Sequence, residues 1–249
     1  MITSHTPVDW KDLQSQVARI LAECGFSVDI EKLVATVRGS VELDVRAEES
    51  VDGRGNSIIC ECKHWRTPVP QTVVHAFRTV VADIGVNVGY IISSAGFQKG
   101  AFEAAANSNI RLVTWPEFQK QFELSWYERF FYPEITERLD SLFSYTEIFL
   151  PAWFERLSEE DKKKLIDLKK KYVELNWLLM NFTTYARMSG SSAAFSLPLI
   201  GYLDATSGLR DTVPMEVLSA TTPREFLVSL IPYGEIVVSQ FEEIRPKDA

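Results

Sequence analysis

Two short runs of residues with a turn between them constrain the fold of this chain most strongly. Val41–Arg46 alternates between apolar and charged side chains. Ser57–Cys60 is mostly apolar and leads directly into a glutamate, a cysteine and a lysine. The stretch that separates the two runs, Asp52–Asn56, is rich in residues that favour turns. The pattern therefore predicts two adjacent strands joined by a turn.

Three charged side chains on these strands form a candidate reactive centre. Glu61 and Lys63 lie two residues apart, so they share one face of their strand, and Asp44 lies in the neighbouring run. Two carboxylates suit a hard cation such as Mg²⁺, and a lysine can orient a water or offset charge on a phosphate. The set favours a metal-dependent nuclease. The alternative is an exposed, polar sheet face, because Glu-x-Lys is common on solvated strands.

The order of the remaining elements favours an α/β domain. Helices are predicted from Trp10 to Cys24, from Val69 to about Ile84 and from Phe97 to Asn107, and strands at Gly89–Ser94 and Ile110–Val113. The apolar run at Gly89–Ser94 is typical of a buried parallel strand.

Four segments carry a resemblance to a known family: Leu43–Val45, Cys60–Trp65, Gln71 at the start of a helix, and Gly89–Ala101. They resemble the catalytic domain of Mrr-like type IV restriction endonucleases, in the PD-(D/E)xK nuclease superfamily. The resemblance covers about residues 8–123. It implies a restriction-endonuclease-like α/β sandwich with a central mixed sheet, dependence on Mg²⁺ (with Mn²⁺ as a substitute), and cleavage of DNA, often modified DNA.

The resemblance also implies roles for individual residues. It assigns metal ligation to Asp44 and Glu61 and the catalytic lysine to Lys63. Gln71 either contacts the metal-bound water or the substrate, or is a surface residue at a helix N-terminus. Gln14 stands where the family often has an acidic residue near the active centre, which brings a second metal position or its affinity into question. Glu42 is either a supplementary ligand or, as burial preferences favour, a solvated charge.

The three cysteines do not make a disulfide framework, so a reducing cytoplasm is the expected location. Cys60 and Cys62 suggest zinc, but no second pair of ligands accompanies them, and small buried side chains are the better interpretation. His64 and His75 are expected at a strand end and on a helix surface. No apolar run long enough for a membrane span occurs, and the N-terminus lacks the features of a signal peptide.

The net charge of the chain argues against high affinity for long duplex DNA. The formal net charge is −8. Residues 1–124 carry 12 Lys and Arg against 15 Asp and Glu, a balance of −3, and residues 125–249 carry 14 against 19, a balance of −5. Proteins that neutralise many phosphates usually present a basic face. We therefore expect weak DNA binding by the first domain alone, and a homo-oligomer or a partner protein that acts through the C-terminal region.

Two domains are predicted, residues 1–124 and a C-terminal accessory region, residues 125–249. In the second, Ser158 is expected to cap a helix that runs to about Tyr185, and Ser189–Ala194 to be a flexible joint. Strands are predicted at Leu197–Leu203 and Glu235–Ser239, whereas Phe226–Ile231 is ambiguous between helix and strand. The region is expected to be mainly helical α+β. Its lysine runs in residues 162–171 are expected to form a solvated helix face balanced by acids.

Three functions compete. The first is an Mg²⁺-dependent endodeoxyribonuclease, in restriction or phage defence, with Asp44, Glu61 and Lys63 at its centre. The second is a catalytically silent nuclease-fold module that binds nucleic acid or a protein. The third is an assembly protein dominated by its aromatic C-terminal half. The intact acidic pair and lysine favour the first.

Overall fold

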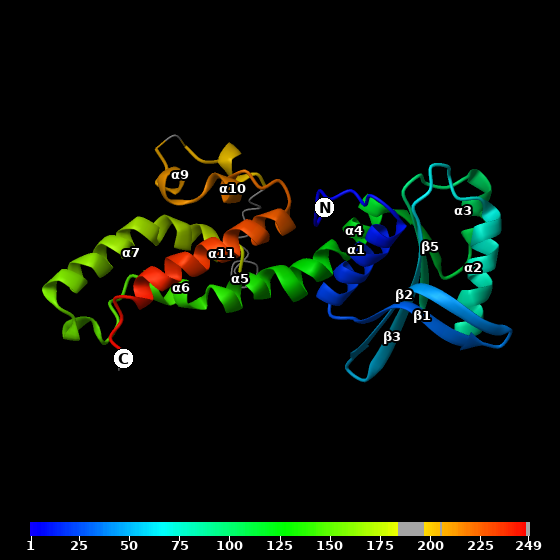
Figure 1. Cartoon of the computed structure of the whole chain (residues 1–249), viewed down its shortest axis with the longest axis horizontal. Helices are drawn as coiled ribbons and strands as arrows, with labels where there is room; N and C mark the ends of the chain where they lie inside the picture. The colour runs from blue at the N-terminus through cyan, green and yellow to red at the C-terminus, as the bar shows by residue number, and fades with distance from the viewer. Residues whose placement is uncertain (184–196, 205, 248–249) are drawn as a thin grey trace. The chain divides into compact units, whose positions relative to one another are not determined.

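The computed structural model describes residues 1–183, 197–204 and 206–247, and the chain folds as two compact units. The first unit comprises Met1 and His5–Arg129, and the second comprises Ile2–Ser4 and the chain from Phe130 onward. Figure 1 shows the sheet and its helices in the first unit and a group of helices in the second.

A five-stranded mixed sheet forms the centre of the first unit. Its strands are β1 (Ser27–Thr36), β2 (Gly39–Val51), β3 (Arg54–Lys63), β4 (Val88–Ser93) and β5 (Ile110–Thr114), in the spatial order β1-β2-β3-β4-β5. The first three strands pair antiparallel, whereas β4 is parallel to β3 and β5 is parallel to β4. The predicted central mixed sheet is confirmed, with β1 as an additional edge strand.

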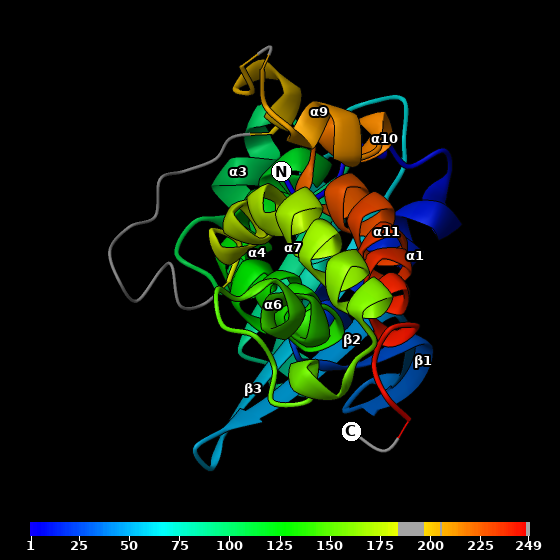
Figure 2. The same cartoon turned by 90° about the vertical axis from the view of Figure 1, so that its left-hand side faces the viewer.

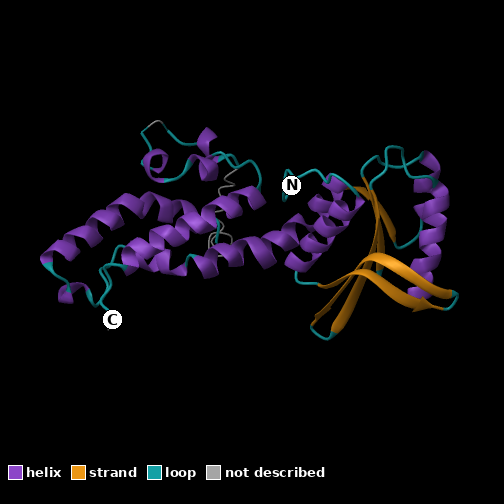
Figure 3. Ribbon diagram, viewed as in Figure 1, coloured by secondary structure: helices purple, strands orange, loops and turns teal. Residues whose placement is uncertain are grey.

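Helices cover both faces of this sheet, as Figure 3 shows. They are α1 (Trp10–Glu23), α2 (Gln71–Ile84), α3 (Lys99–Ala105) and α4 (Trp115–Trp126). On one face, α2 and α3 pack on a core that includes Ile59 and Ile91. On the other, Tyr90 of β4 contacts Phe118 of α4 edge-on, with ring centroids 5.8 Å apart. The predicted α/β sandwich is therefore confirmed.

Local signals set the ends of these helices. The side chain of Asp9 accepts a hydrogen bond from the Asp12 N–H at 2.8 Å and caps α1. Helix α2 begins at Gln71 because Pro70 precedes it, and ends at Gly85, whose φ is +77°. A Cβ atom built on Gly89 would lie 2.5 Å from Val81, so this glycine allows α2 to approach β4 closely.

Helices and turns are the only regular elements among the described residues of the second unit. It contains the α-helices α5 (Tyr132–Arg138), α6 (Asp140–Thr146), α7 (Glu159–Met180), α9 (Leu209–Thr212), α10 (Met215–Leu218) and α11 (Pro223–Glu242). Single 3₁₀ turns lie at Phe154–Arg156 and Leu199–Gly201. A π-helical turn, Tyr127–Phe131, includes the residues at which the first unit ends and the second begins. Figure 2 shows α6, α7 and α11 running side by side. Aromatic rings fill the space between helices, as in the parallel pair Tyr145 and Phe241, whose centroids are 5.1 Å apart.

Two predictions for this unit were wrong. Leu197–Leu203 contains a 3₁₀ turn in place of a strand, and Glu235–Ser239 lies inside α11. The buried residues Leu230, Val237 and Phe241 follow helical spacing over the whole of α11, whereas a short apolar window does not distinguish helix from strand. The same helix resolves the ambiguity at Phe226–Ile231.

Other predictions for the second unit fare better. The Ser158 hydroxyl accepts a hydrogen bond from the Asp161 N–H at 3.1 Å, which confirms the predicted cap of α7. This helix ends at Met180, earlier than predicted. The predicted joint Ser189–Ala194 lies outside the described residues. Within the described part of the chain, no helix is both long and apolar enough to cross a membrane.

Candidate active site

Asp44 lies at a break in the pairing of β1 with β2. The pairs Ile30↔Val45 and Lys32↔Leu43 flank it, but Asp44 and Glu31 are not themselves paired, and Glu31 has a φ of +52°. The Asp44 carboxylate instead accepts a hydrogen bond from the backbone N–H of Cys62 at 2.7 Å. One acid of the predicted centre is thereby held against the strand that carries the other two residues.

Glu61 and Lys63 project from the last residues of β3 and form an ion pair. Their side chains are 25% and 20% exposed, so solvent still reaches both. The Lys63 ammonium also lies over the indole ring of Trp65, 5.6 Å from its centroid, which is a cation–π distance. The pattern-based prediction that Glu61 and Lys63 share a strand face agrees with this contact.

The electrostatics of the pair favour a cation. Burial raises the pKa of the Glu61 carboxyl above its usual range, and the negative charge of Asp44 acts in the same direction, while Lys63 opposes both. Ionised Glu61 is therefore held in a partly buried position next to a second carboxylate. A divalent ion between them would offset this cost.

A hollow of about 340 Å³ lies beside these residues, between β2, β3 and α2. Its polar lining is provided by Glu42, Glu61 and Lys63, and Trp65 also lines it. Its remaining lining is apolar and comes mainly from α2, from Val73, Ala76, Phe77 and Val80, with Val41 of β2. Glu42 therefore lies in the same hollow as Glu61, and its role as a ligand stays a prediction.

Gln14 is buried beneath the site. Its amide nitrogen donates a hydrogen bond of 2.8 Å to the backbone carbonyl of Asp44, and only 2% of its surface is exposed. Gln14 precedes Val17 and Leu21 by three and seven residues, so it lies on the buried stripe of α1. A polar residue within an apolar stripe is the signal that could have identified this contact from the sequence.

Gln71 is exposed as the first residue of α2. A Cβ atom built on Gly100 of α3 would lie 2.8 Å from the Gln71 Oε1 atom, so the side chain of Gln71 lies against α3. Among the described residues, no hydrogen bond joins Gln71 to Asp44, Glu61 or Lys63. The structure thus brings together three of the four candidate residues, and a role for Gln71 stays a prediction.

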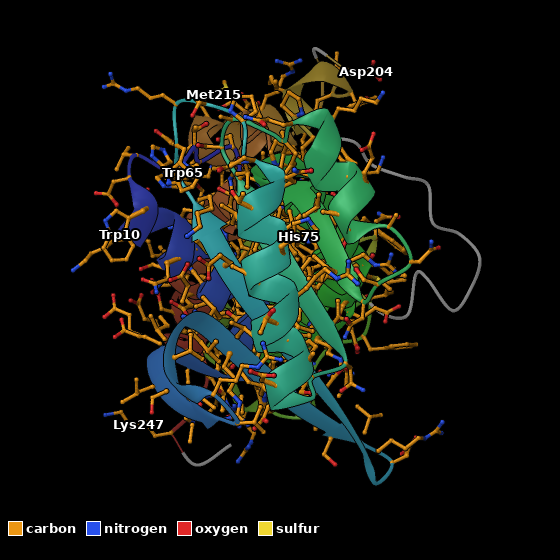
Figure 4. All side chains as sticks on the ribbon, turned by 90° about the vertical axis from the view of Figure 1, so that its right-hand side faces the viewer. Trp10, Trp65, His75, Asp204, Met215 and Lys247 are labelled. Atoms are coloured by element: carbon orange, nitrogen blue, oxygen red, sulfur yellow. The ribbon has the colours of Figure 1, made fainter. Side chains whose placement is uncertain are left out.

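The side chains of Cys60, Cys62, His64 and His75 have structural or surface positions. Cys60 and Cys62 are buried free thiols, as expected of small apolar side chains. His64 Nε2 donates to the Pro7 carbonyl at 3.0 Å, and His75 is exposed on the outward face of α2 (Figure 4). In ranges 1–183, 197–204 and 206–247, no three His, Cys, Asp or Glu side chains are grouped so that they could hold a metal ion.

The residues present fit a hard cation with few protein ligands. Mg²⁺ usually keeps several waters and is bound through one or two carboxylates together with substrate phosphate. Asp44 and Glu61 would supply those carboxylates, the second after turning from Lys63. The donor set is thus consistent with a site completed by water and by the substrate.

The fold and this arrangement define the class: a restriction-endonuclease-like α/β domain, with two acids and a lysine on adjacent central strands. Residues 6–122 match the model of the Mrr catalytic domain, described as a restriction endonuclease. The resemblance that the sequence predicted is thereby confirmed over these residues. Restriction-endonuclease-like domains generally use divalent metals.

One solved structure is similar, the crystal structure of a protein of unknown function, AF1548. It shares 22% identity and covers 67% of this chain and 99% of its own, with a TM-score of 0.40. No curated protein matches the chain.

Proposed function

We propose that this protein is an Mg²⁺-dependent DNA endonuclease with Asp44, Glu61 and Lys63 at its centre. The observation that carries the proposal is the hydrogen bond from the Cys62 N–H to the Asp44 carboxylate, which holds the acid of β2 beside Glu61 and Lys63 of β3. The match of residues 6–122 to the restriction endonuclease model supports the same reaction.

Each residue has a defined part in the proposed hydrolysis. Asp44 and Glu61 would hold the cation, which when bound polarises a phosphate oxygen and lowers the pKa of a water. Lys63, released from Glu61, is free to donate a hydrogen bond to the attacking water or to a non-bridging phosphate oxygen. The centroid of the Trp65 ring lies 5.6 Å from the Lys63 ammonium, and both side chains line the hollow.

Restriction or phage defence in the cytoplasm is the biological role that we propose for this activity. The net negative charge of residues 1–124 suggests that the first unit alone binds DNA weakly and requires a partner or a second copy for tighter binding. A partner could bind the second unit, where Ile148, Phe149 and Trp177 are 84%, 81% and 57% exposed. Exposed apolar groups of this kind mark protein interaction surfaces.

A catalytically silent module is the alternative. The ion pair between Glu61 and Lys63 favours it, because each side chain already satisfies the other without a metal. The two proposals differ in one measurable property, which is metal-dependent cleavage.

Cleavage of supercoiled plasmid tests the proposal. Methylated and unmethylated plasmids are incubated with Mg²⁺ or Mn²⁺ and with wild type, Asp44→Ala or Lys63→Ala, and with Lys120→Ala as a control at an exposed lysine of α4. We expect nicking or linearisation by wild type and Lys120→Ala, abolished by a chelator and by the other two substitutions. Equal cleavage by all four proteins would indicate a contaminant, and none by wild type would favour the silent module.

A further inference from the structure

We propose that the hollow beside Glu61 and Lys63 binds one unstacked nucleobase of the DNA strand, with Trp65 as its stacking platform. The inference rests on the proposed nuclease function and deepens it, because it specifies the substrate. The preferred strand has an unpaired base next to the bond that is cut.

The size and lining of the hollow favour a base over a phosphate chain or a duplex. About 340 Å³ is at the small end of ligand pockets, and a double helix does not fit into it. Five apolar side chains line it, including Val73 and Phe77 of α2, whereas a phosphate site would be lined with donors. A planar aromatic group fits walls of this kind.

Trp65 is held in a position where a base can reach it. Trp65 remains 42% exposed although it lines the hollow. The Ser94 hydroxyl donates a hydrogen bond of 2.9 Å to the Trp65 carbonyl, and the Ser94 N–H donates one of 3.1 Å to the Lys63 carbonyl. Figure 4 shows Trp65 on the segment that leads from β3 to α2. An exposed, anchored indole is a sequence-tolerant stacking surface for a base.

The lysine and the indole act on neighbouring parts of one nucleotide. The Lys63 ammonium is 5.6 Å from the Trp65 centroid. A base on Trp65 therefore places a phosphate of the same strand close to Lys63 and to the carboxylates of the proposed metal site.

Glu42 provides a means to distinguish bases. Its carboxylate is exposed and lines the hollow with Glu61. An ionised carboxylate only accepts hydrogen bonds, so it pairs with the exocyclic amino group of cytosine or adenine and repels the carbonyl oxygen of thymine. We expect amino-bearing bases to be preferred.

The cost of extracting a base determines the substrate. A base must leave its stack to enter the hollow, and this costs least where it is mismatched, damaged or already single-stranded. The strands that bind best are therefore single strands and duplexes with an unpaired base, and continuous duplex binds less well.

The test measures binding without cleavage. Fluorescein-labelled oligonucleotides are titrated in Ca²⁺ as a single strand, as a continuous duplex and as a duplex with one bulged cytosine or thymine. The proteins are wild type, Trp65→Ala, Trp65→Phe and Glu42→Gln, with Phe102→Ala as a control at an exposed aromatic residue of α3 that does not line the hollow.

We expect wild type and Phe102→Ala to bind the bulged and single-stranded probes on the order of tenfold more tightly than continuous duplex. Trp65→Ala should lose this preference without weaker binding to duplex, and Trp65→Phe should keep part of it. Glu42→Gln should remove the preference for bulged cytosine over thymine. Equal affinity of wild type for all probes, or a uniform loss in Trp65→Ala, would overturn the inference.

The result is separable from the proposed cleavage. A Trp65-dependent preference without plasmid cleavage by wild type would keep the base site and reject the nuclease. Cleavage that needs Asp44 and Lys63, without any preference among the probes, would keep the nuclease and reject the base site.

Discussion

Gln14 donates a hydrogen bond from its side-chain amide to the backbone carbonyl of Asp44, across 2.8 Å and almost fully buried. Asp44 also accepts from the Cys62 N–H through its carboxylate. Helix α1 and strand β3 therefore hold the same residue from two sides, at the break in the pairing of β1 with β2. Gln14 is thus a positioning residue for the proposed metal ligand.

Gln14→Glu should destabilise the protein, because an ionised carboxylate accepts hydrogen bonds and cannot donate to the Asp44 carbonyl. The loss of one hydrogen bond and the burial of an unpaired acceptor should lower the free energy of unfolding by about 1–3 kcal/mol at neutral pH. Urea midpoints of the variant and the wild type measure this difference. Burial should raise the pKa of the new carboxyl in the folded state. The deficit should therefore shrink as the pH falls toward about 4, where the protonated acid donates again. An unchanged midpoint would show that the bond contributes nothing.

Metal binding should be visible as thermal stabilisation even without DNA. An ion at one hundred times its Kd adds about 2.7 kcal/mol to the free energy of unfolding, so Mg²⁺ or Mn²⁺ should raise the Tm of the wild type. Asp44→Asn and Glu61→Gln should remove this shift, since each loses a charged ligand. Glu42→Gln tests whether Glu42 is a metal ligand or a solvated charge. If the variant keeps the Tm shift, Glu42 is a solvated charge; if the variant loses the Tm shift, Glu42 is a third ligand.

The capping box at the start of α4 should make stability depend on pH. The Thr114 N–H and hydroxyl donate to the Glu117 carboxylate at 2.7 and 2.8 Å, and these bonds lower the pKa of Glu117. Its contribution is therefore present above the unfolded-state pKa and is lost as the pH falls through the folded-state value.

Glu117→Ala should cost less than about 1 kcal/mol at neutral pH, since the side chain is exposed. The difference from wild type should shrink as the pH falls below the unfolded-state pKa and vanish once the pH is below the lowered folded-state pKa of Glu117. Urea midpoints at several pH values provide the measurement. A difference that stays constant with pH would mean that the carboxylate charge has no part in the cap.

Strands β2 to β5 and helices α1 to α3 were predictable because their signals are local. Alternation across Val41–Arg46 and the apolar run at Gly89–Ser94 each identify a strand from a few neighbouring residues. The same holds for Ser158, where a hydroxyl precedes an acidic first turn. The closeness of Glu61 and Lys63 follows from the two-residue period of a single strand.

Other features depend on contacts between segments far apart in the sequence. The bond from Gln14 to Asp44 joins residues thirty positions apart, and the pairing break at Glu31 requires a positive φ at a non-glycine residue. The hollow beside Trp65 exists only where α2 packs on β2 and β3. In α11, the helix extends well beyond the short window that resembled a strand, and packing on α6 stabilises it.

The three thiols should be unreactive in the folded protein. Burial raises the pKa of Cys24 to about 11, and it raises the pKa values of Cys60 and Cys62 further above the usual range. Thiolate is the reactive form, so both low accessibility and a low thiolate fraction oppose modification. At about pH 8, iodoacetamide should label none of them on the timescale of a model thiol, whereas all three should react in denaturant, as read by intact mass. Because Cys62 donates its N–H to Asp44, rapid labelling of Cys62 in the native protein would show that β3 opens at the proposed site. That result would contradict the rigid placement of Asp44 on which the proposed nuclease centre depends.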